Sequence, residues 1–302
     1  MRKLYTALAL AALLGGAGAA SAQTVAHWRF EEGAPDQEFQ FPPTNGGPGS
    51  GIAVDSAGGD DNLRTFADFT NPVYRSNVPF NPVPRTGQPN NLSLDFNPNE
   101  DLYSEGAPIN NRQFNQFTIE TSVRFDDLDG WQTFLGKDGF QFSNSDPNLS
   151  SLYFQLANDQ ANQDKVAFKV HQADGAFVDV YTLQPVQAGQ WYNFAAILSN
   201  NGDPGNPDAQ TLSLYMFDPS SGQYVLQESK PFVGPMGHQD RNWTVGRGMY
   251  ANNPGDWIDG QVDEVRISDV ALPTSQLLAV VPEPAALGFL GAIGLLALRR
   301  RR

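Results

Sequence analysis

Apolar and polar residues alternate in short runs along most of the chain. In residues 117–125, FTIETSVRF, the apolar side chains Phe117, Ile119, Val123 and Phe125 fall on one side of an extended backbone. Polar side chains take the other side. This period of two predicts a β-strand with one buried face.

Further runs of this kind predict a long series of strands. Two runs in residues 166–183 flank Asp174-Gly175, whose glycine accepts the positive φ of a hairpin turn. No apolar stripe with a helical period occurs between residues 23 and 270, and only residues 273–280 favour a short helix. The other predicted strands lie within residues 92–96, 191–200, 211–217, 223–229, 242–248 and 257–268.

Residues 35–89 are rich in Gly, Pro and Asn and show little alternation. Because a structureless segment of this length is unusual inside one domain, we expect it to contain short edge strands. The 29 glycines and 22 prolines of the chain fit many turns between strands. The sequence therefore predicts an all-β fold, an antiparallel sandwich of two sheets, with residues 23–280 as one domain.

Both ends of the chain depart from this pattern. Residues 1–22 start with Arg2 and Lys3, continue with an apolar run and end at Ala20-Ser21-Ala22, which is typical of an export signal peptide with a helical apolar segment. Residues 285–298 are apolar and just long enough for a transmembrane helix. The arginines that follow favour the cytoplasmic side of the inner membrane, so the domain itself is expected outside.

The order of features in residues 281–302 resembles the PEP-CTERM sorting signal of Gram-negative bacteria. A Pro-Glu-Pro triplet, the apolar span and a cluster of arginines follow one another: Pro282, Glu283 and Pro284, then Arg299, Arg300, Arg301 and Arg302. The resemblance implies transient anchoring in the inner membrane and cutting by an exosortase-type protease. The product would reach the cell surface or the extracellular matrix; an ordinary tail anchor is the alternative.

Composition and charge narrow the possible partners. The formal net charge is −14, and the two ends hold six of the basic residues but only Glu283 of the acidic ones, so the middle is more acidic still. Such a surface repels nucleic acid and anionic lipid and offers carboxylates to divalent cations. The chain has no cysteine, so the exported domain does without disulfides.

Six segments in order resemble the laminin-G-like, concanavalin A-like jelly roll. They are VAHWRFEEG near the start, VDSAGG, NQFTIETSVRF, WQTFLGKDG, QWYNFAAIL and WIDGQVDEVRISDVALP near the end. The resemblance implies two stacked antiparallel sheets, one of them concave, and in many relatives a structural calcium ion. It implies no single function, because lectins, adhesion modules and glycosidases share this fold.

The chain lacks the strand motif Glu-x-Asp-x-x-Glu of the catalytic laminarinase-type relatives. Its nearest approach, Asp259 and Asp263, has aspartates in place of the glutamates that serve as acid and nucleophile. We therefore expect no catalytic residues and no enzyme activity. A glycosidase or lyase with an unrecognised site remains an alternative, and a carboxylate pair or a Tyr/His/Arg cluster on the concave face would indicate it.

Asp263 is the most informative charge. Its parity is that of Val265 and Ile267, so we expect it to face the apolar layer, where an ionised carboxylate needs hydrogen bonds, a base or a cation. A turn-capping role and a calcium ion are both compatible with this. The resemblance to the family adds Glu31, Glu32 and Asp55 as companions of Asp263 at a structural Ca²⁺.

Aromatic residues allow a second kind of site. Trp28, Trp131 and Trp191 lie in strand-like runs and are expected in the core. Tyr250 and Trp257 flank a loop with amide and carboxylate groups that could stack against a sugar and bond to it; the alternative is that Trp257 only covers the core. The candidate ligand residues are Tyr250, Asn252, Asn253, Asp256 and Trp257.

These observations together predict an exported, non-catalytic binding domain that makes glycan or protein contacts at the cell surface or in an extracellular polysaccharide matrix. A purely structural matrix protein is the other alternative. Loops that fill the concave face would favour it.

Overall fold

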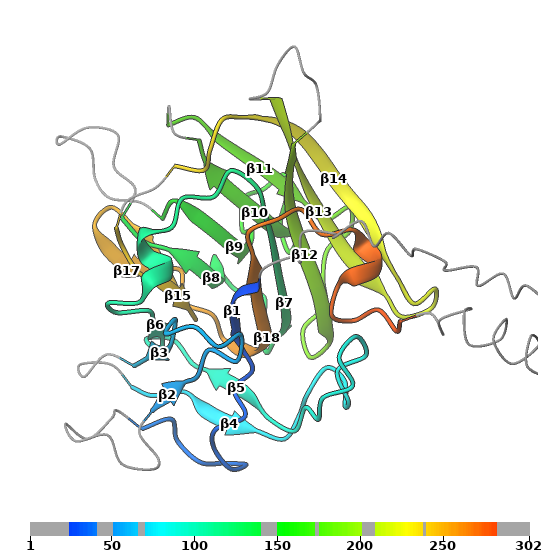
Figure 1. The fold of residues 1–302 in the computed structure, drawn as a ribbon. Coiled ribbons are helices and arrows are strands. Elements are labelled where there is room, and N and C mark those ends of the chain that lie inside the picture. The colour runs from blue at the N-terminus through cyan, green and yellow to red at the C-terminus, as the bar shows by residue number, and fades with distance from the viewer. Residues whose placement is uncertain are drawn as a thin grey trace, which may run out of the picture.

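The computed structural model in Figure 1 describes residues 24–40, 51–65, 70–139, 150–172, 175–200, 209–237 and 240–282. Its strands form two eight-stranded antiparallel sheets and one small hairpin. The first sheet has the order β14 (Gln223–Val233), β13 (Ala209–Asp218), β12 (Trp191–Asn200), β7 (Phe117–Phe125), β18 (Gly260–Ser268), β5 (Ser93–Phe96) and β4 (Val73–Arg75), and β1 (Thr24–Trp28) also pairs with β18.

The second sheet has the order β11 (Phe177–Tyr181), β10 (Val166–His171), β9 (Leu152–Leu156), β8 (Gln132–Lys137), β15 (Trp243–Val245), β6 (Leu102–Tyr103), β3 (Leu63–Arg64) and β2 (Ile52–Ala53). The hairpin consists of β16 (Gly248–Tyr250) and β17 (Asn253–Gly255). The predicted all-β sandwich is confirmed, and β7 spans the predicted residues 117–125.

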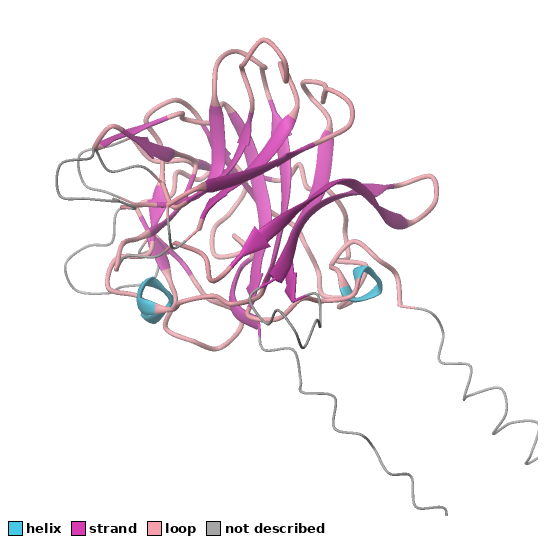
Figure 2. Ribbon diagram, turned by 90° about the horizontal axis from the view of Figure 1, so that it is seen from above, coloured by secondary structure: helices cyan, strands magenta, loops and turns pink. Residues whose placement is uncertain are grey.

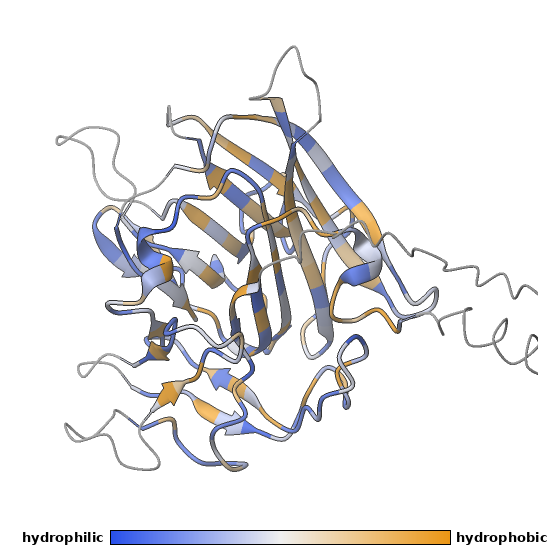
Figure 3. Cartoon of the chain, in the orientation of Figure 1, coloured by the Kyte–Doolittle hydropathy of each residue, from blue (hydrophilic) through white to orange (hydrophobic). Residues whose placement is uncertain are grey.

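The core lies between the two sheets and is rich in phenylalanine. The four apolar residues that alternate along β7 are all buried in it. From the second sheet, Phe134 and Phe154 belong to the same core, and the centroids of these two rings are 4.7 Å apart. Figure 3 shows the same alternation as orange and blue bands along the strands. Aromatic rings bury much apolar area per residue, so this layer provides a large share of the folding free energy.

The glycine- and proline-rich residues 35–89 supply the short edge strands expected there. β4 ends the first sheet and β2 ends the second, and β3 lies next to β2. At the opposite edges, β11 and β14 are joined by side chains: Glu228 accepts a hydrogen bond from the Tyr181 N–H (2.8 Å) and Gln227 accepts one from the Leu183 N–H (3.1 Å). These bonds use backbone donors that an edge strand would otherwise offer to another chain.

Within the part of the chain that the structure describes, helix is confined to two short 3₁₀ turns at the periphery, η1 (Pro108–Asn111) and η2 (Thr274–Gln276), which Figure 2 shows in cyan. The second falls within the residues 273–280 that favoured a short helix. No helix in the described ranges is long and apolar enough to cross a membrane. The predicted signal helix and the span at 285–298 lie outside those ranges.

The outer face of the first sheet is covered, although one exposed face was expected for β7. Glu120, which points outward from β7, accepts hydrogen bonds from the Leu278 N–H (2.7 Å) and from Arg266. Residues 270–280 pack there around the buried Leu277, together with Ala195 and Tyr224. This cover closes part of the outer face of the first sheet.

Candidate functional site

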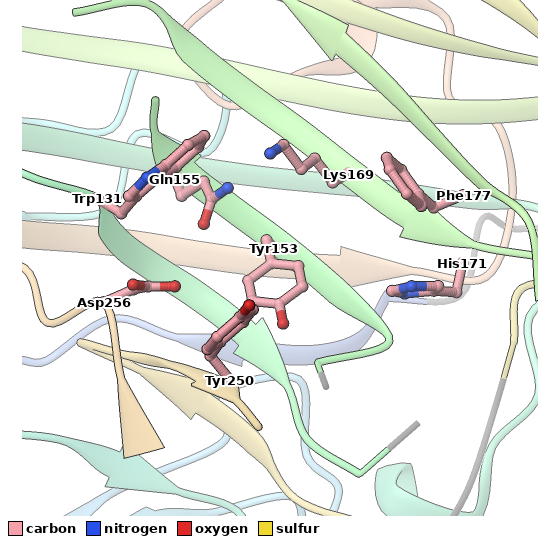
Figure 4. A pocket seen from close by; sticks show the side chains of 8 residues that line it. All are labelled: Trp131, Tyr153, Gln155, Lys169, His171, Phe177, Tyr250 and Asp256. Carbon is pink, nitrogen blue, oxygen red and sulfur yellow. The ribbon is translucent and has the colours of Figure 1, made fainter. Parts of the chain in front are cut away.

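A row of polar and aromatic side chains lies on the outer face of the second sheet. Phe154 and Phe168 point into the core, so their neighbours Tyr153 and Lys169 point outward. The register of β9 and β10 places Lys169 directly opposite Tyr153. Figure 4 shows these two side chains with those of Gln155 and His171 on the same face.

The β16–β17 hairpin forms one wall of this face because two glycines allow close backbone packing. A Cβ on Gly136 of β8 would lie 2.9 Å from the Arg247 carbonyl oxygen, and one on Gly248 would lie 3.1 Å from the Tyr153 ring. The Tyr153 hydroxyl donates a hydrogen bond to the Met249 carbonyl, which fixes the hairpin over the strands. Tyr250 and Asp256 are thereby brought to the rim.

Arg247 anchors the base of the same hairpin from below. Its guanidinium is buried and donates to Asp101 (2.6 Å) and to Asp138 (2.8 Å). Breaking a buried ion pair between an arginine and its carboxylates is costly, because the remaining group is left as an uncompensated buried charge. The hairpin therefore has a fixed position relative to β8.

Between the hairpin and the strands is a half-open cavity of about 420 Å³. Four of its lining residues are aromatic and four are polar or charged: Trp131, Tyr153, Phe177 and Tyr250, then Gln155, Lys169, His171 and Asp256. The expectation that Trp131 and Trp191 lie in the core was wrong, because both side chains are only partly buried. The Trp131 ring faces the cavity, and the Lys169 ammonium lies 4.3 Å from its centroid.

Burial shifts the pKa values of the titratable groups in the cavity. It lowers the pKa of Lys169 and of His171, and it raises the pKa of Asp256. It also raises the pKa of Tyr153 to about 12. Tyr153 therefore keeps its proton at neutral pH, and that proton is already donated to the Met249 carbonyl.

The structure places the five candidate ligand residues in three different surroundings. Tyr250 and Asp256 line the cavity. Asn252 and Asn253 are exposed at the turn of the hairpin, and the partly buried Trp257 forms a parallel bridge with Thr133. Whether any of them contacts a ligand stays a prediction.

Sequence reasoning missed most of the cavity. Tyr153, Gln155, Lys169 and His171 are the outward positions of β9 and β10, and Phe177 belongs to β11. The alternation in residues 166–171 marked Lys169 and His171 as facing away from the core. Their proximity to the hairpin depends on the sheet order, which the sequence pattern did not supply.

The predicted environment of Asp263 was also wrong in one respect. A β-bulge at Glu264, whose φ is +48°, interrupts the alternation of β18. Val262, Val265 and Ile267 all reach the core, whereas Asp263 pairs with Ser122 of β7 on the covered outer face. Its fully buried carboxylate accepts hydrogen bonds from the Asn90 side chain (2.8 Å) and the Glu264 N–H (2.8 Å).

The three companions expected at a calcium ion have separate partners. Asp55 accepts hydrogen bonds from three backbone N–H groups, those of residues 27, 57 and 59. Glu31 accepts them from the backbone of Asn91 and Leu92, and Glu32 from that of Val54. No group of three or more His, Asp or Glu side chains in the described ranges is arranged to hold a metal ion. Each of these carboxylates is thus satisfied by hydrogen bonds of its own, and the calcium ion stays a prediction.

Of the predicted sorting signal, only Pro282 is within the described residues. Glu283, Pro284 and Arg299 to Arg302 lie outside them.

A comparison with protein families matches residues 101–277 to the concanavalin A-like lectin/glucanases superfamily. The chain belongs to this superfamily. A search of curated proteins found no significant match. The superfamily, as its description states, includes lectins and glucanases, so membership establishes the fold and leaves the activity open.

Several solved structures have a fold similar to that of this chain but a low sequence identity to it. Domain 4 of AbnA, a GH43 extracellular arabinanase from Geobacillus stearothermophilus solved in complex with arabinotriose, has 17% identity and a TM-score of 0.51, and the match covers 86% of this chain and 98% of that one. The receptor-binding domain of botulinum neurotoxin type G has 9% identity and a TM-score of 0.48, over 84% and 50% of the two chains. The CBM40 of the Ruminococcus gnavus IT-sialidase, bound to α2,3-sialyllactose, has 16% identity and a TM-score of 0.39, over 56% and 84%.

Proposed function

We propose that this chain is a non-catalytic glycan-binding domain and that the sugar binds in the cavity on the outer face of the second sheet. The observation that carries the proposal is the lining of that cavity by four aromatic rings beside hydrogen-bonding side chains. Aromatic rings offer flat apolar surface, and Gln155 and Asp256 offer donors and acceptors for hydroxyl groups.

The same lining argues against a glycosidase, whereas a lyase stays the alternative because Tyr250 and His171 also line the cavity. Glycoside hydrolysis normally needs two carboxyl groups, and Asp256 is the one carboxylate among the described residues that line the cavity. A lyase needs a group that removes a proton from the sugar. Tyr153 is a poor candidate, because its hydroxyl is engaged with Met249 and its pKa is raised to about 12.

The comparison with AbnA supports the proposal at the level of the fold. That domain was solved with arabinotriose, so a domain with this arrangement of strands can carry a short oligosaccharide.

The test is a glycan array probed with the full chain and with Tyr250→Ala. Tyr250 is 68% exposed, so its loss should leave the melting temperature nearly unchanged. Binding should weaken about tenfold, the equivalent of the ~1.4 kcal/mol that an aromatic contact can supply. As a control, Trp191→Ala removes a partly exposed ring from the first sheet, outside the cavity, and should leave binding intact. Unchanged binding by Tyr250→Ala would contradict the proposed site.

The proposed place of action is the cell surface or extracellular polysaccharide matrix of a Gram-negative bacterium. The signal peptide and the order Pro-Glu-Pro, apolar span and arginines support export, a transient stay in the inner membrane and exosortase-type processing. A reporter enzyme that works only outside the cytoplasm, fused after residue 280, should be active. An inactive fusion of normal abundance would contradict export.

A further inference from the structure

Lys169 lines the cavity, and no described residue forms an ion pair with it. Its ammonium rests over the ring of Trp131, 4.3 Å from the centroid. Among the described residues, no carboxylate comes within 4.0 Å of it and no hydrogen bond is made by its Nζ. Figure 4 shows the end of the side chain directed toward Trp131 across the cavity.

The carboxylates that act on Lys169 from a distance are those of Asp179, Asp159 and Asp256. Asp179 is opposite Lys169 in the neighbouring strand, but it bonds to the Lys230 ammonium (3.1 Å) and the Tyr181 hydroxyl (2.8 Å). Asp159 accepts hydrogen bonds from its own turn. Asp256 is on the hairpin side of the cavity and forms no ion pair with Lys169 among the described contacts, although each charge acts on the pKa of the other from a distance.

A partly buried cation that lacks a counter-ion is costly, because it has lost part of its hydration without a compensating charge. Burial lowers the pKa of Lys169 for this reason, and its effect is larger than that of the distant aspartates, which raise the pKa. A ring below the ammonium holds it in place but leaves its N–H donors free for a ligand. An anionic group in the cavity would form a charge-assisted hydrogen bond there.

We propose that the cavity recognises a glycan that carries carboxylates, a polyuronate, and that one carboxylate pairs with Lys169. This inference rests on the proposed function and names the class of sugar. The strongly acidic surface of the chain repels a polyanion at long range. Specific recognition therefore depends on a local cation, and the cavity holds one lysine.

The experiment uses the full chain in mild detergent and three polyuronates, polygalacturonate, alginate and hyaluronate, each beside its carboxyl-reduced neutral form. We expect at least one polyuronate to bind about tenfold or more tightly than its reduced form. Lys169→Met should abolish that difference while keeping the weaker binding of the neutral form. Lys169→Arg, which keeps the positive charge, is the matched control and should preserve most of the preference.

The outcomes separate the inference from the function on which it rests. Equal binding of both forms, sensitive to Tyr250→Ala, would overturn the polyuronate inference and leave glycan binding intact. A preference that survives in Lys169→Met at an unchanged melting temperature would also overturn it. No binding of any saccharide on this panel or on the array would overturn both proposals.

Discussion

At the scale of single residues, the buried charges show how the chain places polar groups where no water reaches them. Asp263 is fully buried, and burial together with the charge of Glu264 raises its pKa well above the usual range. Glu264 itself bonds to His27 (2.6 Å) and Arg29 (2.8 Å). Each carboxylate thus has at least one partner from a distant part of the sequence, Asn90 for Asp263 and residues 27 and 29 for Glu264.

The raised pKa of Asp263 makes stability depend on pH in a defined direction. An Asp in the unfolded chain titrates near pH 3.9, so its contribution to folding is fully present below about pH 4 and is lost as pH rises through the higher folded pKa. Relative to Asp263→Asn, which does not ionise, the wild type should lose free energy of unfolding over this window. Urea unfolding of both proteins at a series of pH values measures the difference, and a constant difference would contradict the prediction.

The same pair of proteins tests the calcium prediction. An ion held by Asp263 would stabilise only the folded wild type, by about 2.7 kcal/mol at 100 times its dissociation constant. The wild type should then melt several degrees higher in calcium than in chelator, and Asp263→Asn should not. Equal melting temperatures would leave Asp263 with its two hydrogen bonds alone.

At the scale of elements, the site depends on how closely the β16–β17 hairpin approaches β8. That approach requires a glycine at position 136, where a side chain would meet the Thr244 hydroxyl at 2.7 Å and the Arg247 carbonyl at 2.9 Å. The hairpin carries Tyr250 and Asp256 follows it, so its displacement would open the cavity.

We expect Gly136→Ala to lower the free energy of unfolding by about 1–3 kcal/mol, the usual cost of overpacking. Glycan binding should weaken in the same variant because one wall of the cavity moves. Gly255→Ala is the control within the hairpin, since its Cβ would meet nothing within 4 Å. Calorimetry and the glycan assay report the two effects, and a Gly136→Ala protein with unchanged binding would show that the hairpin is not part of the site.

At the scale of the whole molecule, the two outer faces of the sandwich are unlike. The first sheet is covered by residues 270–280 and by the segment that brings Asn90 to Asp263. The second sheet keeps its cavity open. The cover behaves as a second, smaller core.

Loss of an anchor in this cover should therefore cost as much as a substitution in the main core. Leu277 is fully buried, and Leu277→Ala should lower the free energy of unfolding by about 2–5 kcal/mol. Leu183, which is 59% exposed, supplies the control, because Leu183→Ala should cost little. Chemical unfolding measures both, and similar values for the two variants would mean that residues 270–280 do not stabilise the fold.

The sequence predicted the sandwich and many of its strands, because alternation such as that of β7 is a local property of the chain. It predicted no strand at β8 or β9, which lie beneath the cavity. It missed the bulge at Glu264, since a residue with positive φ there leaves no mark on the apolar pattern. It also put Trp131 in the core, because a strand-like run does not tell which side of a sheet a flanking ring takes. The cavity combines β9, β10 and a hairpin about a hundred residues later, and such proximity arises only from sheet order and register.

The position of residues 270–282 bears on how the molecule can be displayed. These residues run along the outer face of the first sheet, whereas the cavity opens on the far side of the sandwich. The last described residues and the cavity thus lie on opposite outer faces of the sandwich. A support attached through the outer face of the first sheet would leave the cavity open to long polymers.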